Sequence, residues 1–354
     1  MLSKESLEFF KQLVEAPSPS GFEQPAARVF REYVSEFASE VKTDVMGNSI
    51  AVLNKDAEVR VMLDAHIDQI GMIARFVNDQ GLIYVNAIGG LNILTLPGTR
   101  MYIHSEKGRV LGVVGRKAIH QMEEEEKKAV PKLEDIWIDI GAKDKKDALD
   151  KISIGDPITF EASFEHLENN RVVSAGFDDK MGVLIVAETL KALSKEKLEV
   201  AVYGVAAVQE EVGLRGTKTA AYGINPQVGI AVEVNFANDY PGVNKQKWGE
   251  TDLGKGPTVT SGPNINPKLR EIITKAAQDK KIPYQDDAQG ASTSTDANLM
   301  QVNKVGMATA LVSVPLRYMH TQNEIISLDD IENCIKLLVE SIKNIKADTS
   351  FIPE

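Results

Sequence analysis

The sequence predicts an α/β fold with a mixed sheet, into which a small β-rich domain is inserted. Helical and strand patterns alternate at both ends of the chain, as in a sheet covered by helices. Between them, residues 70–164 contain short β-rich runs separated by turn signals, as in a small barrel or sandwich. The length of 354 residues suggests roughly two domains. We therefore expect a discontinuous α/β domain of residues 1–69 and 165–354, with residues 70–164 inserted.

The elements of the α/β domain are predicted from apolar periodicity. Ser3 can cap the first helix, and Pro17 stops it. The apolar residues recur at helical spacing over residues 3–15, 23–38, 179–193, 267–279 and 328–344. Apolar runs rich in β-branched residues predict strands over residues 49–53, 59–63, 198–207, 229–234 and 307–314.

The inserted segment is predicted from short strands with glycine and proline turns between them. The β-rich runs are residues 71–76, 82–85, 101–104, 110–114, 136–140 and 158–160. Within the segment, residues 120–132 include four consecutive glutamates, Glu123 to Glu126. Such a concentration of charge favours an exposed loop without site chemistry.

Composition restricts the class of protein. The hydrophobic fraction of 43% and the charged fraction of 26% are typical of a globular chain. A net charge of -11 argues against nucleic acid and anionic membranes as partners. The single cysteine, Cys334, has no partner for an internal disulfide and lies in a helical apolar pattern. The chain shows neither a signal-peptide pattern nor an apolar run of roughly 18 residues, so we expect a cytoplasmic protein.

Two adjacent carboxylates, Glu210 and Glu211, follow the predicted buried strand of residues 198–207. In open α/β sheets, ligands bind at the carboxyl ends of the strands. Like charges repel, and burying them costs several kcal/mol each unless cations neutralise them. A solvated acidic turn is the alternative interpretation of this pair alone.

A histidine also lies at the end of a predicted strand. His66 and Asp68 are two residues apart on an extended chain, so their side chains share a face. A carboxylate that accepts the second imidazole N–H is a common partner of a metal-binding histidine. A histidine packed in the core is the alternative.

Three further polar positions occur where elements begin or end. Asp178 and Asp179 precede a predicted helix, where they also suit a helix cap. Glu233 lies inside an apolar run and would be costly there without a partner. His320 follows a strand that breaks at Pro315.

Together these positions supply two imidazoles and three carboxylates at the ends of separate elements. Mixed nitrogen and oxygen ligands suit zinc, cobalt or manganese. Five such groups are too many for one tetrahedral ion but match two ions roughly 3.5–4 Å apart. The candidate ligands are His66, Asp178, Glu211, Glu233 and His320.

Five runs of the sequence are similar, in the same order, to the motifs of a known family. The runs are residues 65–68, 176–180, 208–213, 232–234 and 314–320. They resemble those of the tetrahedral (TET) aminopeptidases, metallopeptidase family 42 of clan MH, which includes glutamyl aminopeptidases. The likeness covers essentially the whole chain, and the run 292–297 resembles a Thr-Asp-Ala segment near the family's site.

The resemblance implies a fold, an activity and a metal cofactor. The fold would be a phosphorylase/hydrolase-like metallopeptidase domain with an inserted β-barrel or PDZ-like domain. The activity would be removal of N-terminal residues from short peptides, with an acidic (glutamyl) preference as one option. Two divalent ions would bind per subunit, with zinc expected and cobalt or manganese as alternatives. The inserted domain would mediate assembly into a homo-oligomer, a tetrahedral dodecamer.

The resemblance also implies a role for each site residue. One ion would be held by His66, Asp178 and Glu233, and the other by Asp178, Glu211 and His320, with Asp178 bridging. Glu210 would be the general base, Asp68 would orient His66, and the Asp178–Asp179 peptide would be cis.

Two departures from the family pattern concern the site. Position 233 is glutamate where aspartate is usual, and Gln69 stands where glutamate is common. Neither departure removes a ligand, although the longer side chain of Glu233 places its oxygens about one bond further out.

Three alternatives to an aminopeptidase remain open. A related binuclear deacylase would use a similar metal set. A glycosidase could use two carboxylates but would need neither His66 nor His320. A metal-binding assembly protein would not need Glu210. An acidic preference would require a basic group in the pocket, for which the candidates are Lys180, Lys245, Lys247 and Arg317.

Overall fold

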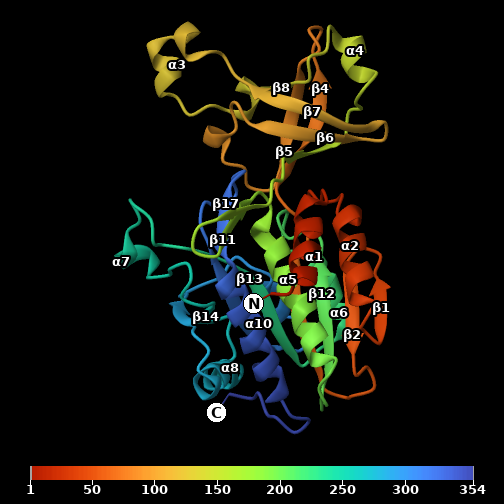
Figure 1. The fold of residues 1–354 in the computed structure, drawn as a ribbon, viewed down its shortest axis with the longest axis vertical. Helices are drawn as coiled ribbons and strands as arrows, with labels where there is room; N and C mark the ends of the chain where they lie inside the picture. Colours follow the sequence, from red (N-terminus) through yellow and green to blue (C-terminus); the bar gives the residue numbers. More distant parts are fainter. Residues whose placement is uncertain (1, 354) are drawn as a thin grey trace.

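The structure, a computed structural model, describes residues 2–353. Two parts are stacked along its long axis, an α/β domain and a smaller β-barrel at one end (Figure 1). Both chain ends belong to the α/β domain, and the barrel is formed by a central part of the chain. The α/β class with an inserted barrel is the fold that the sequence predicts.

The α/β domain is built on a mixed sheet of eight strands. In spatial order they are β1 (Glu40–Thr43), β2 (Ser49–Leu53), β12 (Ala201–Ala207), β3 (Arg60–His66), β13 (Val228–Phe236), β16 (Ala308–Leu316), β14 (Thr258–Ser261) and β15 (Gln285–Ala288). The central strands β12, β3, β13 and β16 are parallel to one another, while β2 and β14 pair with them antiparallel. The carboxyl ends of four neighbouring strands therefore meet at one edge of the sheet.

Helices cover both faces of this sheet. On one face the apolar core includes residues of α1 (Lys4–Glu15), α2 (Gln24–Val34), α5 (Phe177–Leu193), α8 (Pro267–Lys280) and α10 (Leu328–Lys343). The core on the other face includes residues of α6 (Arg215–Ile224) and α9 (Ala297–Gln301). Because side chains alternate along a strand, Leu63 joins the first core and its neighbour Met62 the second.

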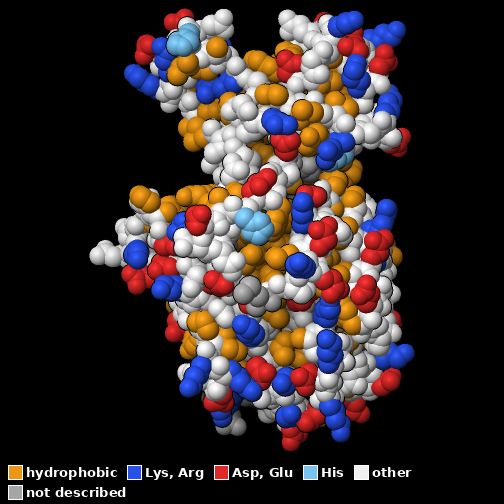
Figure 2. Space-filling view, viewed as in Figure 1, with side chains coloured by type: hydrophobic (Ala, Val, Ile, Leu, Met, Phe, Trp, Pro, Cys, Tyr) orange, Lys and Arg blue, Asp and Glu red, His pale blue; other side chains and the backbone are white. Residues whose placement is uncertain are grey.

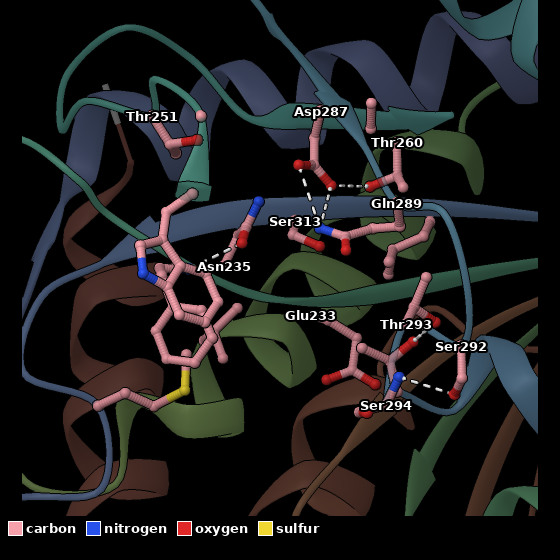
Figure 3. A pocket seen from close by; sticks show the side chains of 18 of the residues that line it. Glu233, Asn235, Thr251, Thr260, Asp287, Gln289, Ser292, Thr293, Ser294 and Ser313 are labelled. Carbon is pink, nitrogen blue, oxygen red and sulfur yellow. Dashed lines mark hydrogen bonds between the residues drawn. The ribbon is translucent and has the colours of Figure 1, made fainter. Parts of the chain in front are cut away.

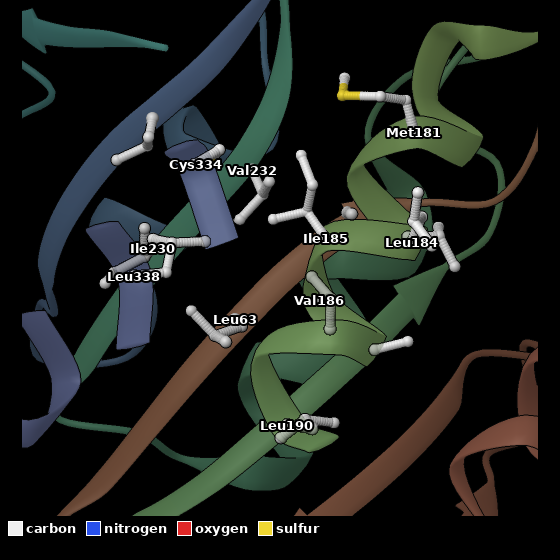
Figure 4. Close-up of a cluster of buried hydrophobic side chains, with 14 of the residues drawn as sticks. Leu63, Met181, Leu184, Ile185, Val186, Leu190, Ile230, Val232, Cys334 and Leu338 are labelled. Atoms are coloured by element: carbon white, nitrogen blue, oxygen red, sulfur yellow. The ribbon is translucent and has the colours of Figure 1, made fainter. Parts of the chain in front are cut away.

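The first core packs α5 and α10 directly onto the central strands. Figure 4 shows Leu63, Ile230 and Val232 of the sheet facing the apolar side chains of these two helices. Cys334 lies in this core and is a free, buried thiol. The burial of this apolar surface fixes the sheet edge from which the candidate site residues project.

The barrel has its own apolar core. In spatial order its strands are β4 (Gly71–Val77), β5 (Ile83–Ile88), β8 (Trp137–Asp139), β7 (Gly108–Gly115), β6 (Arg100–Ser105) and β9 (Pro157–Phe160), and the barrel is closed. Its core is a separate cluster that includes Met72, Met101 and Ile158. These strands lie within residues 70–164, and the division of the chain at these two boundaries stays a prediction.

Smaller elements complete the structure. A three-stranded sheet of β10 (Glu165–Leu167), β11 (Arg171–Ser174) and β17 (Glu324–Ser327) lies next to the connection to the barrel (Figure 1). The short helices are η1 (Ile93–Thr95), η2 (Ile119–Gln121), α3 (Glu124–Lys128), η3 (Leu133–Asp135), α4 (Lys145–Leu149) and α7 (Lys245–Trp248). The segment predicted to be a charged loop thus carries a helical turn, α3, whose N-terminus the Glu126 carboxylate caps.

Charged side chains of both signs are interspersed over the barrel and the α/β domain on the face in Figure 2, without an extended basic patch there. No helix of residues 2–353 is long and apolar enough to cross a membrane.

Candidate active site

The predicted site residues come together at the carboxyl edge of the parallel strands. His66 is the last residue of β3, and Glu210 and Glu211 lie just beyond the end of β12. Glu233 lies in β13, Asp178 at the start of α5, and His320 shortly after β16; together with Asp68 these are the seven residues named from the sequence. The topology therefore gathers side chains that are far apart in the chain.

Asp178 lies between the two imidazoles. Its Oδ1 is 3.1 Å from Nε2 of His66, and its Oδ2 is 3.3 Å from Nε2 of His320. Glu211 Oε1 is 3.4 Å from the same nitrogen of His320, and Glu233 Oε2 is 3.8 Å from Nε2 of His66. A carboxylate that presents one oxygen to each imidazole is the arrangement that a bridging metal ligand requires. The Asp178–Asp179 peptide bond is cis.

Both imidazoles are held in the tautomer that a metal ligand needs. Nδ1 of His66 lies 3.0 Å from the carbonyl oxygen of Asp68, and Nδ1 of His320 lies 2.7 Å from that of Gly90. A carbonyl oxygen only accepts hydrogen bonds, so each Nδ1 is the donor. Each Nε2 therefore faces the carboxylates and is the nitrogen that could give its lone pair to a metal ion. Gly90 follows barrel strand β5, so the inserted domain helps to orient His320.

Two further carboxylates fix the backbone around the site. Asp68 accepts the main-chain N–H of Glu210 at 2.9 Å and that of Glu211 at 3.2 Å. Glu324 accepts the N–H of His320 at 3.0 Å and that of Asp178 at 3.2 Å. The positions of the candidate ligands are thus set by hydrogen bonds to their own main chain.

The carboxylates carry more negative charge than the histidines offset. Burial raises the pKa of Glu210 to about 8, although the charge of His66 opposes the rise. Burial likewise raises the pKa of Glu233 well above its usual range. Asp178 is the exception, since His320 and His66 outweigh its burial and hold its pKa below the usual range. Divalent cations are the ligands that relieve such a surplus.

The donor set is suited to divalent metal ions. Three groups have ligand atoms within 4.8 Å of one another, namely Asp178 with Glu211 and His320, His66 with Asp179 and Glu233, and His66 with Glu210 and Glu211. The first is the set expected for one ion. In the second, Asp179 takes the place expected for Asp178. Glu211 Oε1 is buried without a hydrogen-bond partner among the described residues, as expected of an oxygen that binds a cation.

Two buried acids lie behind the site: Asp64, which the sequence-based prediction missed, and Asp296, which belongs to the run 292–297 expected near the site. Asp64 accepts a hydrogen bond from Thr217 Oγ1 at 2.6 Å, and burial raises its pKa to about 6. The main-chain N–H of Asp296 donates to Glu233 Oε1 at 3.2 Å. Asp64 lies in an apolar strand, so the signal that identified Glu233 was available for it too.

Two of the four basic residues considered for an acidic substrate preference, Lys180 and Arg317, are already engaged. Lys180 is fully buried and donates to the carbonyl oxygens of Val14 and Ala16, at 3.2 and 2.7 Å. Arg317 makes a bidentate pair with Asp239, both distances being 2.7 Å. These contacts direct both cations away from the candidate metal ligands.

A cleft of about 1310 Å³ opens beside the candidate metal ligands. Figure 3 shows that it extends from Glu233 across the sheet to Asp287 and Gln289, with Ser292, Thr293 and Ser294 along one side. His66, Glu210 and His320 line the same cleft. It is wide enough for a peptide segment next to the site.

The fold and this cluster of carboxylates and imidazoles define a metal-dependent hydrolase. The model of the M42 glutamyl aminopeptidases matches residues 47–337. The chain belongs to this family and is a metalloaminopeptidase, and membership of the family implies a binuclear metal site.

Curated relatives and solved structures agree over nearly the whole chain. The lysyl aminopeptidase of Pyrococcus furiosus is 36% identical over 343 residues, which cover 96% of this chain and 97% of that protein. The glutamyl aminopeptidase of Lactococcus lactis is 27% identical over 90% of this chain and 91% of its own. A TET aminopeptidase from a marine sediment archaeon (Thaumarchaeota archaeon SCGC AB-539-E09) is 32% identical, covers 97% of both chains and superimposes with a TM-score of 0.93. The TET1 peptidase of Pyrococcus horikoshii is 30% identical, covers 96% of this chain and 100% of its own, and has a TM-score of 0.85.

Proposed function

We propose that this chain is a binuclear metal-dependent aminopeptidase that removes N-terminal residues from short peptides. The observation that carries the proposal is the position of Asp178 between Nε2 of His66 and Nε2 of His320, at 3.1 and 3.3 Å. A carboxylate that faces a different imidazole with each of its oxygens suits a pair of ions and is not needed for a single one. Family membership supports the reaction, and the cleft supports a peptide as the substrate.

The proposed ligands are those expected from the sequence. His66, Asp178 and Glu233 would hold one ion, and Asp178, Glu211 and His320 the other. When bound, the two ions would lower the pKa of the attacking water and polarise the scissile carbonyl. We propose zinc as the metal. Cobalt and manganese are the alternatives, because nitrogen and oxygen ligands also bind these two ions.

Glu210 is proposed as the general base. Its Oε2 lies 3.9 Å from Nε2 of His66, so the carboxylate stands beside the ligands and is not required as one of them. It would take a proton from the attacking water and return it to the nitrogen of the leaving amine. Asp68 holds the main chain of Glu210 and would act as a positioning residue.

Assembly is proposed from the relatives. The Pyrococcus horikoshii TET1 peptidase assembles into a tetrahedron or a large octahedral shell, and a TET1 structure contains a dodecamer. We propose a homo-oligomer for this chain too, with a tetrahedral dodecamer as the expected form and the barrel as the assembly domain. A hollow assembly would admit short peptides and exclude folded proteins. The cytoplasmic location stays a prediction.

The test is hydrolysis of aminoacyl anilides, each with an N-acetylated counterpart, before and after chelation. Cleavage restricted to free-amine substrates, lost with chelator and regained with zinc, is the expected result. Cleavage of the acetylated substrates would favour the deacylase. Activity that resists chelation would overturn the metal mechanism and would reopen the glycosidase alternative.

The preferred N-terminal residue is a separate question. The acidic preference considered from the sequence stays a prediction, and the engaged basic side chains give it no support. The relatives carry both kinds of name, lysyl and glutamyl aminopeptidase. The residues that line the cleft opposite the candidate metal ligands are the ones that could determine which N-terminal residue is preferred.

A further inference from the structure

A carboxylate faces the cleft three strands away from Glu233. Glu233 on β13 pairs with Ser313 on β16, and Ser313 pairs with Thr258 on β14. Thr260, two residues further along β14, pairs with Asp287 on β15. Three strand spacings of about 4.8 Å separate β13 from β15 by about 14 Å. Figure 3 shows Glu233, Ser313, Thr260 and Asp287 around the same pocket.

Asp287 is held in place by neutral groups. Thr260 Oγ1 donates to its Oδ2 at 3.0 Å. Gln289 Nε2 lies 3.3 Å from both of its carboxylate oxygens. The side chain is half-buried, and no ion pair involves it among residues 2–353. Its negative charge therefore faces the cleft without an ion pair among the described residues.

The adjacent acid does have a cation. Because side chains alternate along a strand, Asp286 points to the opposite face from Asp287. There its carboxylate pairs with Arg270 of α8, at 2.5 Å. Arg270 and Asp286 nevertheless line the same cleft, where they form an ion pair with each other. The two neighbouring acids thus differ in pairing, since Asp286 has a cation as its partner and Asp287 has only neutral hydrogen-bond donors.

The lysines at the cleft are also engaged elsewhere. Lys245 pairs with Glu250 at 3.2 Å, and Nζ of Lys247 lies 4.6 Å from the centre of the Trp248 ring. Both belong to α7, outside the strands that carry Thr260 and Asp287. Around Asp287 the cleft is lined by Thr260, Ser313 and the apolar Leu311, together with Arg270, whose guanidinium is paired with Asp286. This surface offers an apolar contact followed by an unpaired carboxylate.

We propose that Asp287 is a specificity-determining residue that selects peptides with a basic N-terminal residue, lysine or arginine. The inference rests on the proposed function and names its substrate class. An N-terminal residue whose amino group and carbonyl lie at the candidate metal ligands would extend its side chain along Leu311 towards Asp287. A long, flexible basic side chain ends in a cation that the carboxylate can bind, whereas a short or acidic side chain cannot make this contact.

The test compares substrates that differ only in the terminal charge. L-lysyl-p-nitroanilide and L-norleucyl-p-nitroanilide share the four-carbon stem, and only lysine carries the ammonium. For the metal-loaded protein we expect kcat/KM to be about 10- to 150-fold higher for the lysyl substrate, the range for a hydrogen bond to a charged group. Asp287→Asn, which keeps an oxygen for Thr260, should bring this ratio near one. Asp287→Glu should retain the preference, and Asp287→Lys should shift it towards the glutamyl anilide.

The control is Asp279→Asn, the same loss of one charge at an exposed position of α8 outside the cleft. It should leave the lysyl-to-norleucyl ratio unchanged. A wild-type protein that cleaves norleucyl or glutamyl substrates as fast as lysyl ones would overturn this inference and leave the aminopeptidase intact. So would an Asp287→Asn variant with the wild-type ratio. Failure to cleave any free-amine anilide with metal present would instead overturn the proposed function, and the inference with it.

Discussion

The carboxylate of Asp68 accepts the main-chain N–H of Glu210 at 2.9 Å. The same carboxylate accepts the N–H of Glu211 at 3.2 Å and the hydroxyl of Ser20 at 2.6 Å, and its Oδ1 lies 3.5 Å from Nδ1 of His66. One buried side chain thus connects the histidine at the end of β3 to the loop after β12. The proposed base and two proposed ligands are positioned by the same group.

We expect Asp68→Asn to lower both metal affinity and turnover. The amide nitrogen of asparagine cannot accept, so at least one of the donors from Ser20, Glu210 and Glu211 would lose its partner. Loss of such a partner of a metal-binding histidine typically costs about 10- to 100-fold. Metal titration and kcat at saturating metal measure the two effects. Ser20→Ala, which removes one hydrogen bond, should have a smaller effect, and a wild-type kcat in Asp68→Asn would contradict the positioning role.

Glu210→Gln should separate catalysis from metal binding. The substitution preserves the shape of the side chain but removes the proton acceptor, so kcat should fall by about 10²- to 10⁴-fold. Metal content, measured after dialysis, should remain at the wild-type value. Glu211→Gln, the matched change at the next residue, should instead reduce metal content, because Glu211 lies 3.4 Å from His320 as a proposed ligand. Full activity in metal-loaded Glu210→Gln would contradict the assignment of Glu210 as the general base.

Periodicity and motif order predicted most of the architecture. The central strands are continuous apolar runs because helices bury both of their faces, so β3, β12 and β13 stood out in the sequence. Strands β14 and β15 were not predicted. The second of them, Gln285–Ala288, contains two aspartates and has no apolar alternation, because it lies at the edge of the sheet. Tertiary pairing, not local propensity, places it there.

The candidate ligands could be named from the sequence because each interrupts or ends an apolar run. The groups that hold these ligands in place could not be predicted from the sequence. Gly90 offers only a carbonyl oxygen to His320, and no side chain signals that role. Glu324 begins the short strand β17, and its two main-chain contacts depend on how the chain turns after His320. The direction in which Asp287 points follows from strand pairing that the sequence did not show.

The loop that carries Glu210 and Glu211 depends on a close approach at Gly216. A Cβ at this position would lie 2.2 Å from the carbonyl oxygen of Val208 and 2.4 Å from Oδ1 of Asn48. We therefore expect Gly216→Ala to destabilise the protein by about 1–3 kcal/mol or more. The matched control is Gly223→Ala in the same helix, where a Cβ would meet nothing within 4 Å. Chemical denaturation should show a loss for the first variant and none for the second; equal effects would contradict the packing argument.

His104 should make the protein less stable in mild acid. Burial, with the charges of Arg109 and Lys180, lowers the pKa of this histidine from 6.5 to about 4, and its Nε2 lies 2.8 Å from Thr159 Oγ1. Between these two pH values the unfolded chain binds a proton that the folded chain excludes. The histidine's contribution is therefore complete above about pH 6.5 and is lost as the pH falls towards 4.

Replacement of this imidazole provides the measurement. His104→Gln keeps a polar group for Thr159 but cannot titrate, so its free energy of unfolding should fall less than that of the wild type between pH 7 and pH 4. Denaturant titrations at several pH values give the difference, and His120→Gln, which removes an exposed imidazole from the barrel loop, is the control. A difference between wild type and His104→Gln that does not change with pH would show that the folded protein admits the proton.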